Sequence, residues 1–245
     1  LILLVVGVFF GIRGLVRLFG GEESTSPYGL PSYIQEDYLT INPYSRPGIK
    51  LPGGVQGIVV HYVGNPGTSA QNNRDYFEGL KDSGDTSASS NFIIGLDGEI
   101  IACVPIDEVA YASNSANDYT LSIECCHPDE TGQFTDATYE SLVRLTAYLC
   151  DRFDLDSQDV VRHYDVSPSQ KACPLYFVEH TDAWESFRQE VQTATDQLRA
   201  ETASAAESSS GAENSPASSE GEGTAEGESE GTAEADGTGA ENAAE

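Results

Sequence analysis

Basic residues are scarce in this chain. It contains 12 Lys and Arg against 40 Asp and Glu, which gives a formal net charge of −28. A protein that binds nucleic acid needs a basic surface to neutralise phosphates, so this balance argues against a nucleic-acid partner. The sequence also lacks internal repeats and any glycine-rich motif that would cradle a phosphate, which excludes a repeat fold and a phosphate-binding loop.

Apolar runs of membrane-spanning length are lacking too. Residues 1–12 are apolar, but a transmembrane helix needs about 20 such residues. Arg13 and Arg17 follow, and a polar linker opens at Gly20. We expect residues 1–21 to be the remainder of a longer membrane anchor or signal segment, which would place the protein outside the cytoplasm. A core strand or helix is the alternative interpretation of this run.

The C-terminal segment has no basic residue at all. Residues 201–245 contain 12 Asp or Glu among Ala, Gly, Ser and Thr, and such a composition cannot bury enough apolar surface to offset its ordering entropy. We therefore expect a disordered acidic tail over residues 196–245. With residues 22–49 as a linker and approach segment, residues 50–195 remain for a single domain, which we expect to be monomeric.

Hydrophobic patterns within this domain alternate irregularly between strand and helix. Val59 and Val60 lie in a short β-branched run, Asp97-Gly98 is a strong hairpin signal, and Thr135 precedes a helical apolar stripe. The sequence thus predicts an α/β fold with a central mixed β-sheet flanked by helices. The predicted strands cover 57–63, 90–95, 99–105, 119–126 and a short run ending at His163, and helices begin near Ser69, Thr135 and Asp182.

Cysteine occurs five times, an odd number that argues against a complete disulfide framework. Cys125 and Cys126 are neighbours on a predicted strand and therefore point to opposite faces, so they cannot easily bridge each other. We expect buried, reduced cysteines.

Histidine occurs only four times, and two of the four end predicted strands. If the strands of His61 and His163 are parallel neighbours, both imidazoles lie at one edge of the sheet. Cys173 follows ten residues after His163, held before a proline. Zinc prefers such N and S donors, so these three residues are candidate ligands for one zinc ion. His127 and His180 are expected to be a loop residue and a helix-start residue instead.

Four blocks carry a resemblance to a known family: GIVVHY at 57–62, SNFIIGLDG at 90–98, LSIE at 121–124, and RHYD through KACP at 162–174. In this order they resemble the zinc-dependent N-acetylmuramoyl-L-alanine amidases, whose fold is shared by phage amidase lysozymes and peptidoglycan-recognition proteins. The resemblance covers about residues 40–190. It implies a peptidoglycan hydrolase that cleaves the amide between N-acetylmuramic acid and the L-alanine of the stem peptide, on the cell-wall side of a bacterium.

The resemblance also assigns roles to residues. It makes His61, His163 and Cys173 the ligands of one Zn²⁺, Glu124 the group that accepts a proton from water, and Lys171 the cation that stabilises the oxyanion.

The sequence departs from the family pattern at two places. Ser90 and Asn91 stand where many relatives have Tyr and His, and a family histidine near Tyr111 is absent. From their positions alone, Tyr62, Asn91 and Tyr111 are candidates for lining the substrate cleft.

Two alternatives to the zinc hydrolase stay open, a binding module and an enzyme with a cysteine nucleophile. The chain is either an active hydrolase or a peptidoglycan-binding module that has lost turnover, and the three retained ligands favour the hydrolase. In a third interpretation Cys173 is a nucleophile activated by His163.

Overall fold

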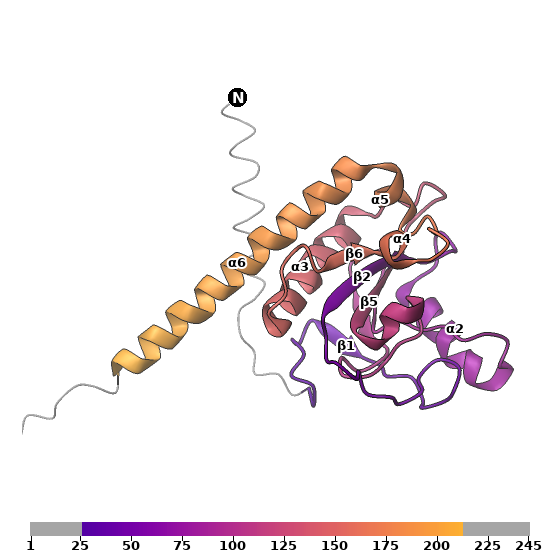
Figure 1. Cartoon of the computed structure of the whole chain (residues 1–245), viewed down its shortest axis with the longest axis horizontal. Coiled ribbons are helices and arrows are strands. Elements are labelled where there is room, and N and C mark those ends of the chain that lie inside the picture. The colour runs from indigo at the N-terminus through magenta and orange to yellow at the C-terminus, as the bar shows by residue number, and fades with distance from the viewer. Residues whose placement is uncertain (1–25, 213–245) are drawn as a thin grey trace, which may run out of the picture. The chain divides into compact units, whose positions relative to one another are not determined.

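A six-stranded sheet lies at the centre of the fold (Figure 1), with strand order β1-β4-β3-β5-β2-β6. The structure is a computed structural model that describes residues 26–212, so the expected anchor at 1–21 and the tail beyond 212 lie outside the described residues. The strands are β1 (Ile34–Glu36), β2 (Gly57–Tyr62), β3 (Phe92–Ile94), β4 (Ile100–Ala102), β5 (Thr120–Cys125) and β6 (Val160–Arg162). The helices are α2 (Ala70–Ser83), α3 (Asp136–Phe153), α4 (His163–Val166), α5 (Leu175–Glu179) and α6 (Thr181–Ala212), with a 3₁₀ helix η2 (Asn114–Asp118).

The strand pairing is mixed, as predicted. β3 and β4 form the antiparallel hairpin, with Gly98 at φ +83° in its turn, and the other neighbouring pairs are parallel. β2 lies between β5 and β6, in a register that sets His61 opposite Glu124. The carboxyl ends of β2, β5 and β6 therefore meet at one edge of the sheet.

Helices cover both faces of the sheet. On one face α2 packs Phe77 and Leu80 against Ile93 and Ile101. On the other face α3 and α6 cover the sheet, with buried residues that include Leu142, Leu145, Phe187 and Val191. Ser69 caps α2 and Thr135 caps α3 through side-chain oxygens that accept backbone N–H groups. The predicted helix starts are therefore confirmed.

The cysteines are also placed as predicted. All five are buried and free, and Cys125 and Cys126 belong to the cores on opposite faces of the sheet.

Two parts of the fold differ from the boundaries that the sequence predicts. β1 lies within the expected linker, where Leu30, Ile34 and Leu39 are buried. A three-residue strand is too short to show a period of two, so the pattern did not reveal it.

The last helix also passes the expected start of the tail. α6 continues beyond residue 196 to Ala212, and Arg199 within this part donates to the carbonyl oxygens of Cys150 and Leu155 at 3.3 and 2.9 Å.

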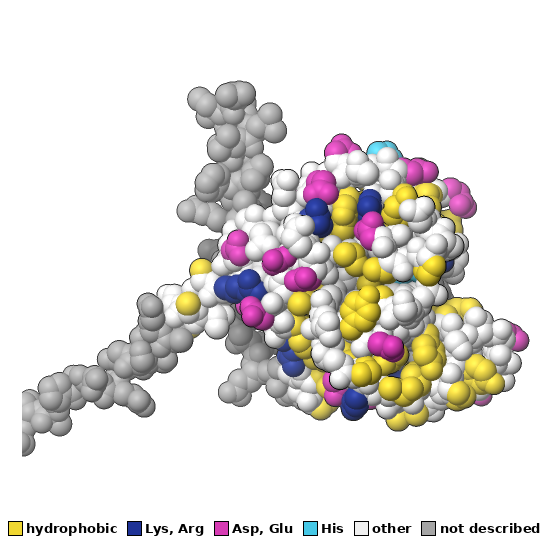
Figure 2. Space-filling model, viewed as in Figure 1, with side chains coloured by type: hydrophobic (Ala, Val, Ile, Leu, Met, Phe, Trp, Pro, Cys, Tyr) yellow, Lys and Arg dark blue, Asp and Glu magenta, His cyan; other side chains and the backbone are white. Residues whose placement is uncertain are grey.

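The surface agrees with the charge analysis on the face shown in Figure 2, where Lys and Arg side chains are scattered among acidic ones and form no patch. Among the residues that the structure describes, no helix combines the length and the apolar character needed to cross a membrane.

Candidate metal centre

The three candidate ligands come together at the edge where β2 and β6 end. His61 lies near the end of β2, His163 is the first residue of α4 directly after β6, and Cys173 precedes α5. All three side chains are buried, and their potential ligand atoms lie within 4.8 Å of one another. The parallel pairing of β2 with β6 brings the two imidazoles together, as the sequence predicts.

Direct contacts define this cluster. The Sγ of Cys173 lies 3.9 Å from Nδ1 of His61, and the ring centroids of His61 and His163 are 4.6 Å apart. The loop from His163 to Cys173 is closed by the backbone N–H of Tyr164, which donates to the carbonyl oxygen of Cys173 at 2.9 Å. This hydrogen bond joins the two ends of the loop and so brings Cys173 back beside His163.

The environment of His61 and His163 favours the neutral form of both imidazoles, which is the form that binds a metal. Burial lowers the pKa of His61, and the neighbouring His163 and Lys171 lower it further. Burial and Lys171 also lower the pKa of His163. Neither ring nitrogen of His163 has a hydrogen-bond partner among residues 26–212, although both are buried. Unpartnered buried nitrogens of a neutral ring beside a thiol fit a metal site, because a bound ion would satisfy them.

The surroundings of Cys173 do not favour the thiolate form that a nucleophilic cysteine needs. Burial raises the pKa of its thiol to about 12, and the nearby Glu124 carboxyl acts in the same direction. A nucleophilic cysteine needs a lowered pKa, so the interpretation with a cysteine nucleophile has no support from this geometry.

Glu124 lies next to the cluster on β5. Its Oε1 is 3.9 Å from Nδ1 of His61, and its Oε2 is buried without a hydrogen-bond partner among the described residues. Burial raises the pKa of this carboxyl to about 8, while the charge of Lys171 acts to lower it. A carboxyl that titrates near neutral pH beside a metal site can both accept and return a proton.

Lys171 is exposed and lies in the loop between His163 and Cys173. Its positive charge acts to lower the pKa values of His61, His163, Glu124 and Cys173. The structure thus brings His61, His163, Cys173 and Glu124 together and places Lys171 in the loop between two of the ligands.

The three residues proposed to line a cleft differ from one another in their exposure and contacts. Tyr62 is partly exposed and its ring lies against that of His127, with centroids 5.0 Å apart. Tyr111 is partly buried against the main core. Its carbonyl oxygen accepts the backbone N–H of Ser89 at 3.1 Å, and its own N–H donates to the side-chain Oγ of Ser89 at 2.9 Å.

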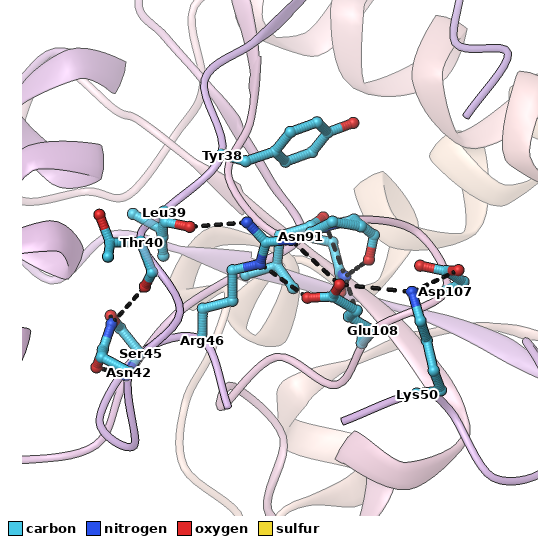
Figure 3. Close-up of polar contacts among 12 residues, drawn as sticks. Tyr38, Leu39, Thr40, Asn42, Ser45, Arg46, Lys50, Asn91, Asp107 and Glu108 are labelled. Carbon is cyan, nitrogen blue, oxygen red and sulfur yellow. Dashed lines mark hydrogen bonds and ion pairs between the residues drawn. The ribbon is translucent and has the colours of Figure 1, made fainter. Parts of the chain in front are cut away.

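Asn91 is fully buried, and the structure contradicts a role in contacting substrate. Its amide donates to the carbonyl oxygens of Pro105 and Glu108 at 3.2 and 3.3 Å, and its Oδ1 accepts the N–H of Ser122 at 3.0 Å. Figure 3 shows it beside the Arg46–Glu108 ion pair, within a network that joins the start of β3 to the loop after β4. A strand-start position in the sequence cannot tell a buried amide from a cleft residue.

The other two histidines are not ligands. His127 is buried, and its ring nitrogens lie 2.7 Å from the carbonyl oxygen of Asp129 and 2.6 Å from that of Val63. His180 is exposed and stacks on Tyr176 between α5 and α6. Both agree with their predicted places.

Sequence reasoning missed Ser113. Its Oγ lies 3.0 Å from Nε2 of His61, on the opposite side of the ring from Cys173. Nothing in the local pattern around Ser113 points to a histidine 52 positions away.

The model of the Amidase_2 family, described as N-acetylmuramoyl-L-alanine amidase, matches residues 51–175, a range that includes all three clustered ligands and Glu124. The chain belongs to this family. Among curated amidases it is similar to CwlL of Bacillus licheniformis, 34% identical over 172 residues that cover 65% of this chain and 47% of CwlL. It is also similar to BlyA of Bacillus subtilis strain 168, 30% identical over 194 residues that cover 71% of this chain and 50% of BlyA. The chain spans about half the length of these curated relatives.

Solved structures support the family fold. The structure of PlyL aligns with a TM-score of 0.55 at 20% identity, covering 65% of this chain and 96% of PlyL. The catalytic domain of XlyA aligns with a TM-score of 0.52 at 24% identity, covering 64% of this chain and 98% of that domain. The Amidase_2 fold is thus present in nearly complete form in this chain.

Proposed function

We propose that this chain is a zinc-dependent peptidoglycan hydrolase that cleaves the amide between N-acetylmuramic acid and the L-alanine of the stem peptide. The observation that carries the proposal is the convergence of His61, His163 and Cys173 beside Glu124 in a member of this amidase family.

The donor set favours zinc. Two imidazoles and one thiolate are typical zinc ligands and leave a fourth position for solvent or substrate in a catalytic site. Imidazole and thiolate donors on one tetrahedral zinc ion lie roughly 3.5 Å apart. The distance of 3.9 Å between Nδ1 of His61 and Sγ of Cys173 is close to this value. When bound, zinc would supply a Lewis acid that activates water and polarises the amide carbonyl.

The protein's own groups supply the proton transfers. In its ionised form Glu124 would accept the proton of the attacking water at its unpartnered Oε2 and pass it to the leaving amine. Lys171 would donate to the oxyanion that forms at the carbonyl oxygen when water adds to the carbonyl carbon, an interaction worth roughly 3–4 kcal/mol for one well-placed donor. Burial of the three ligands keeps them away from competing solvent.

Digestion of purified peptidoglycan tests the proposal. The wild type should release stem peptides with free L-alanine N-termini, while His163→Ala should release none and should lose its zinc. His180→Ala is the matched control, because His180 is an exposed histidine outside the cluster. Release of new reducing sugar ends in place of L-alanine N-termini would show cleavage of a glycosidic bond and would overturn the proposal.

The same assay separates the alternative function. A peptidoglycan-binding module would sediment with the wall and contain zinc, yet release no peptide. The proposed substrate also implies action on the cell-wall side of a bacterium, which fractionation of producing cells would test.

A further inference from the structure

The two histidines of the cluster are held differently by the protein. In His61, the ring nitrogen Nε2 has a hydrogen-bond partner, the Oγ of Ser113 at 3.0 Å. His163 has no hydrogen-bond partner for either ring nitrogen among residues 26–212. Ser113 is 1% exposed and therefore makes this contact away from bulk water.

The contact and the place of the other two ligands together assign the proton of His61. A neutral imidazole has one N–H and one lone pair. Nδ1 faces Cys173 Sγ and Glu124 Oε1, each at 3.9 Å, so a metal ligand in this position needs the lone pair at Nδ1. The proton then resides on Nε2, which donates to the Ser113 hydroxyl oxygen.

Ser113 is itself held in place by its loop. The backbone N–H groups of Ala112 and Ser113 both donate to Oδ1 of Asn117, and the carbonyl oxygen of Ser113 accepts from Ala116 N–H at 3.1 Å. Asn114 adopts φ +55° directly after Ser113, which turns the chain into η2. A fixed backbone gives the hydroxyl a defined direction toward β2.

We propose that Ser113 is a positioning residue for the metal centre, which orients the His61 ring and holds it in the tautomer that presents the Nδ1 lone pair to the ion. Asn117 supports this role by fixing the backbone of Ser113. This inference rests on the proposed function in one respect, because it takes the bound ion to be zinc.

Zinc affinity and ring protonation test the proposal together. Ser113→Ala should weaken zinc binding by about 10- to 100-fold in competition with a chromogenic chelator, the range found when an outer partner of a metal-bound histidine is lost. Ser113→Thr keeps the hydroxyl and should retain affinity closer to that of the wild type. Long-range ¹H–¹⁵N spectra of the metal-free and zinc-loaded protein should show His61 protonated at Nε2 in the wild type and a changed tautomer balance in Ser113→Ala.

Ser45→Ala is the matched control. Ser45 is also fully buried, and its Oγ accepts one hydrogen bond from the side-chain nitrogen of Asn42 at 2.9 Å, within a different network (Figure 3). Its zinc affinity should equal that of the wild type. Equal losses in Ser45→Ala and Ser113→Ala would assign the effect to general destabilisation and overturn the proposal, as would wild-type affinity and an unchanged His61 signal in Ser113→Ala.

A failure of the proposed function is distinguishable from these outcomes. If the wild type binds no zinc, the proposed function fails, whereas the tautomer of His61 in the metal-free protein still decides the role of Ser113.

Discussion

Cys173 and His61 are 112 positions apart in the chain, yet the thiol Sγ lies 3.9 Å from the imidazole Nδ1. The contact depends on two independent features, the parallel pairing of β2 with β6 and the closed loop between His163 and Cys173. A site built from such distant segments is sensitive to the loss of any one ligand, because the remaining two cannot complete it.

The first prediction concerns Cys173. Cys173→Ser should lower zinc affinity by more than tenfold, because a hydroxyl is a much weaker zinc donor than a thiolate. Cys150→Ser is the control, since Cys150 is a buried cysteine of α3 outside the cluster. Zinc content after dialysis against a chelator series is the measurement. Equal retention of zinc by both variants would remove Cys173 from the site.

The second prediction separates the roles of Glu124 and the ligands. Glu124→Gln keeps the size and neutrality of the protonated side chain but cannot accept a proton, so kcat should fall by about 10²- to 10⁴-fold. The zinc content should stay that of the wild type, because Glu124 is not among the three clustered ligands. Turnover of a soluble muropeptide and metal analysis of the same preparation provide the two readouts. Unchanged kcat would exclude Glu124 as the proton acceptor.

The third prediction follows from the buried amide of Asn91. Asn91→Ala leaves the Ser122 N–H and the carbonyl oxygens of Pro105 and Glu108 without this partner, which should destabilise the fold by about 2–4 kcal/mol. Because Asn91 does not face solvent, KM of the folded variant should stay that of the wild type. Urea unfolding and steady-state kinetics measure the two quantities. A higher KM without loss of stability would restore Asn91 as a substrate residue.

The fourth prediction concerns the pH dependence of stability at Glu78 on α2. Burial acts to raise the pKa of its carboxyl, but hydrogen bonds from Lys81 and Thr40 outweigh it and lower the pKa to about 2. Because the pKa in the folded state is below that of the unfolded state, the stabilisation is present above about pH 4.3 and is lost as pH falls toward 2. Glu78→Gln should therefore cost about 1–2 kcal/mol at pH 7 and progressively less below pH 4.

Unfolding by denaturant between pH 3 and 7 would measure this difference. Asp82→Asn is the control, because it removes a neighbouring carboxylate of the same helix whose side chain is 79% exposed. A difference between wild type and Glu78→Gln that stays constant over this range would contradict the prediction.

The sequence by itself determined the types of element and the chemistry of the ligands. Local signals were sufficient here: the β-branched run of β2, the caps Ser69 and Thr135, and the turn at Gly98 all operate within a few residues. His61, His163 and Cys173 were recognisable because two of only four histidines stand at the ends of predicted strands and a thiol follows ten residues after the second, which together are donors that zinc prefers.

Only the tertiary structure decided which side chains meet. Strand order and register set Glu124 opposite His61, and the fold buried Asn91 in a network where the sequence suggested a cleft. The same holds for Ser113, whose contact with His61 joins a loop before β5 to the adjacent strand β2. Periodicity and capping report on neighbours along the chain, whereas contacts across 31 to 112 positions depend on how whole strands pair, which no local pattern encodes.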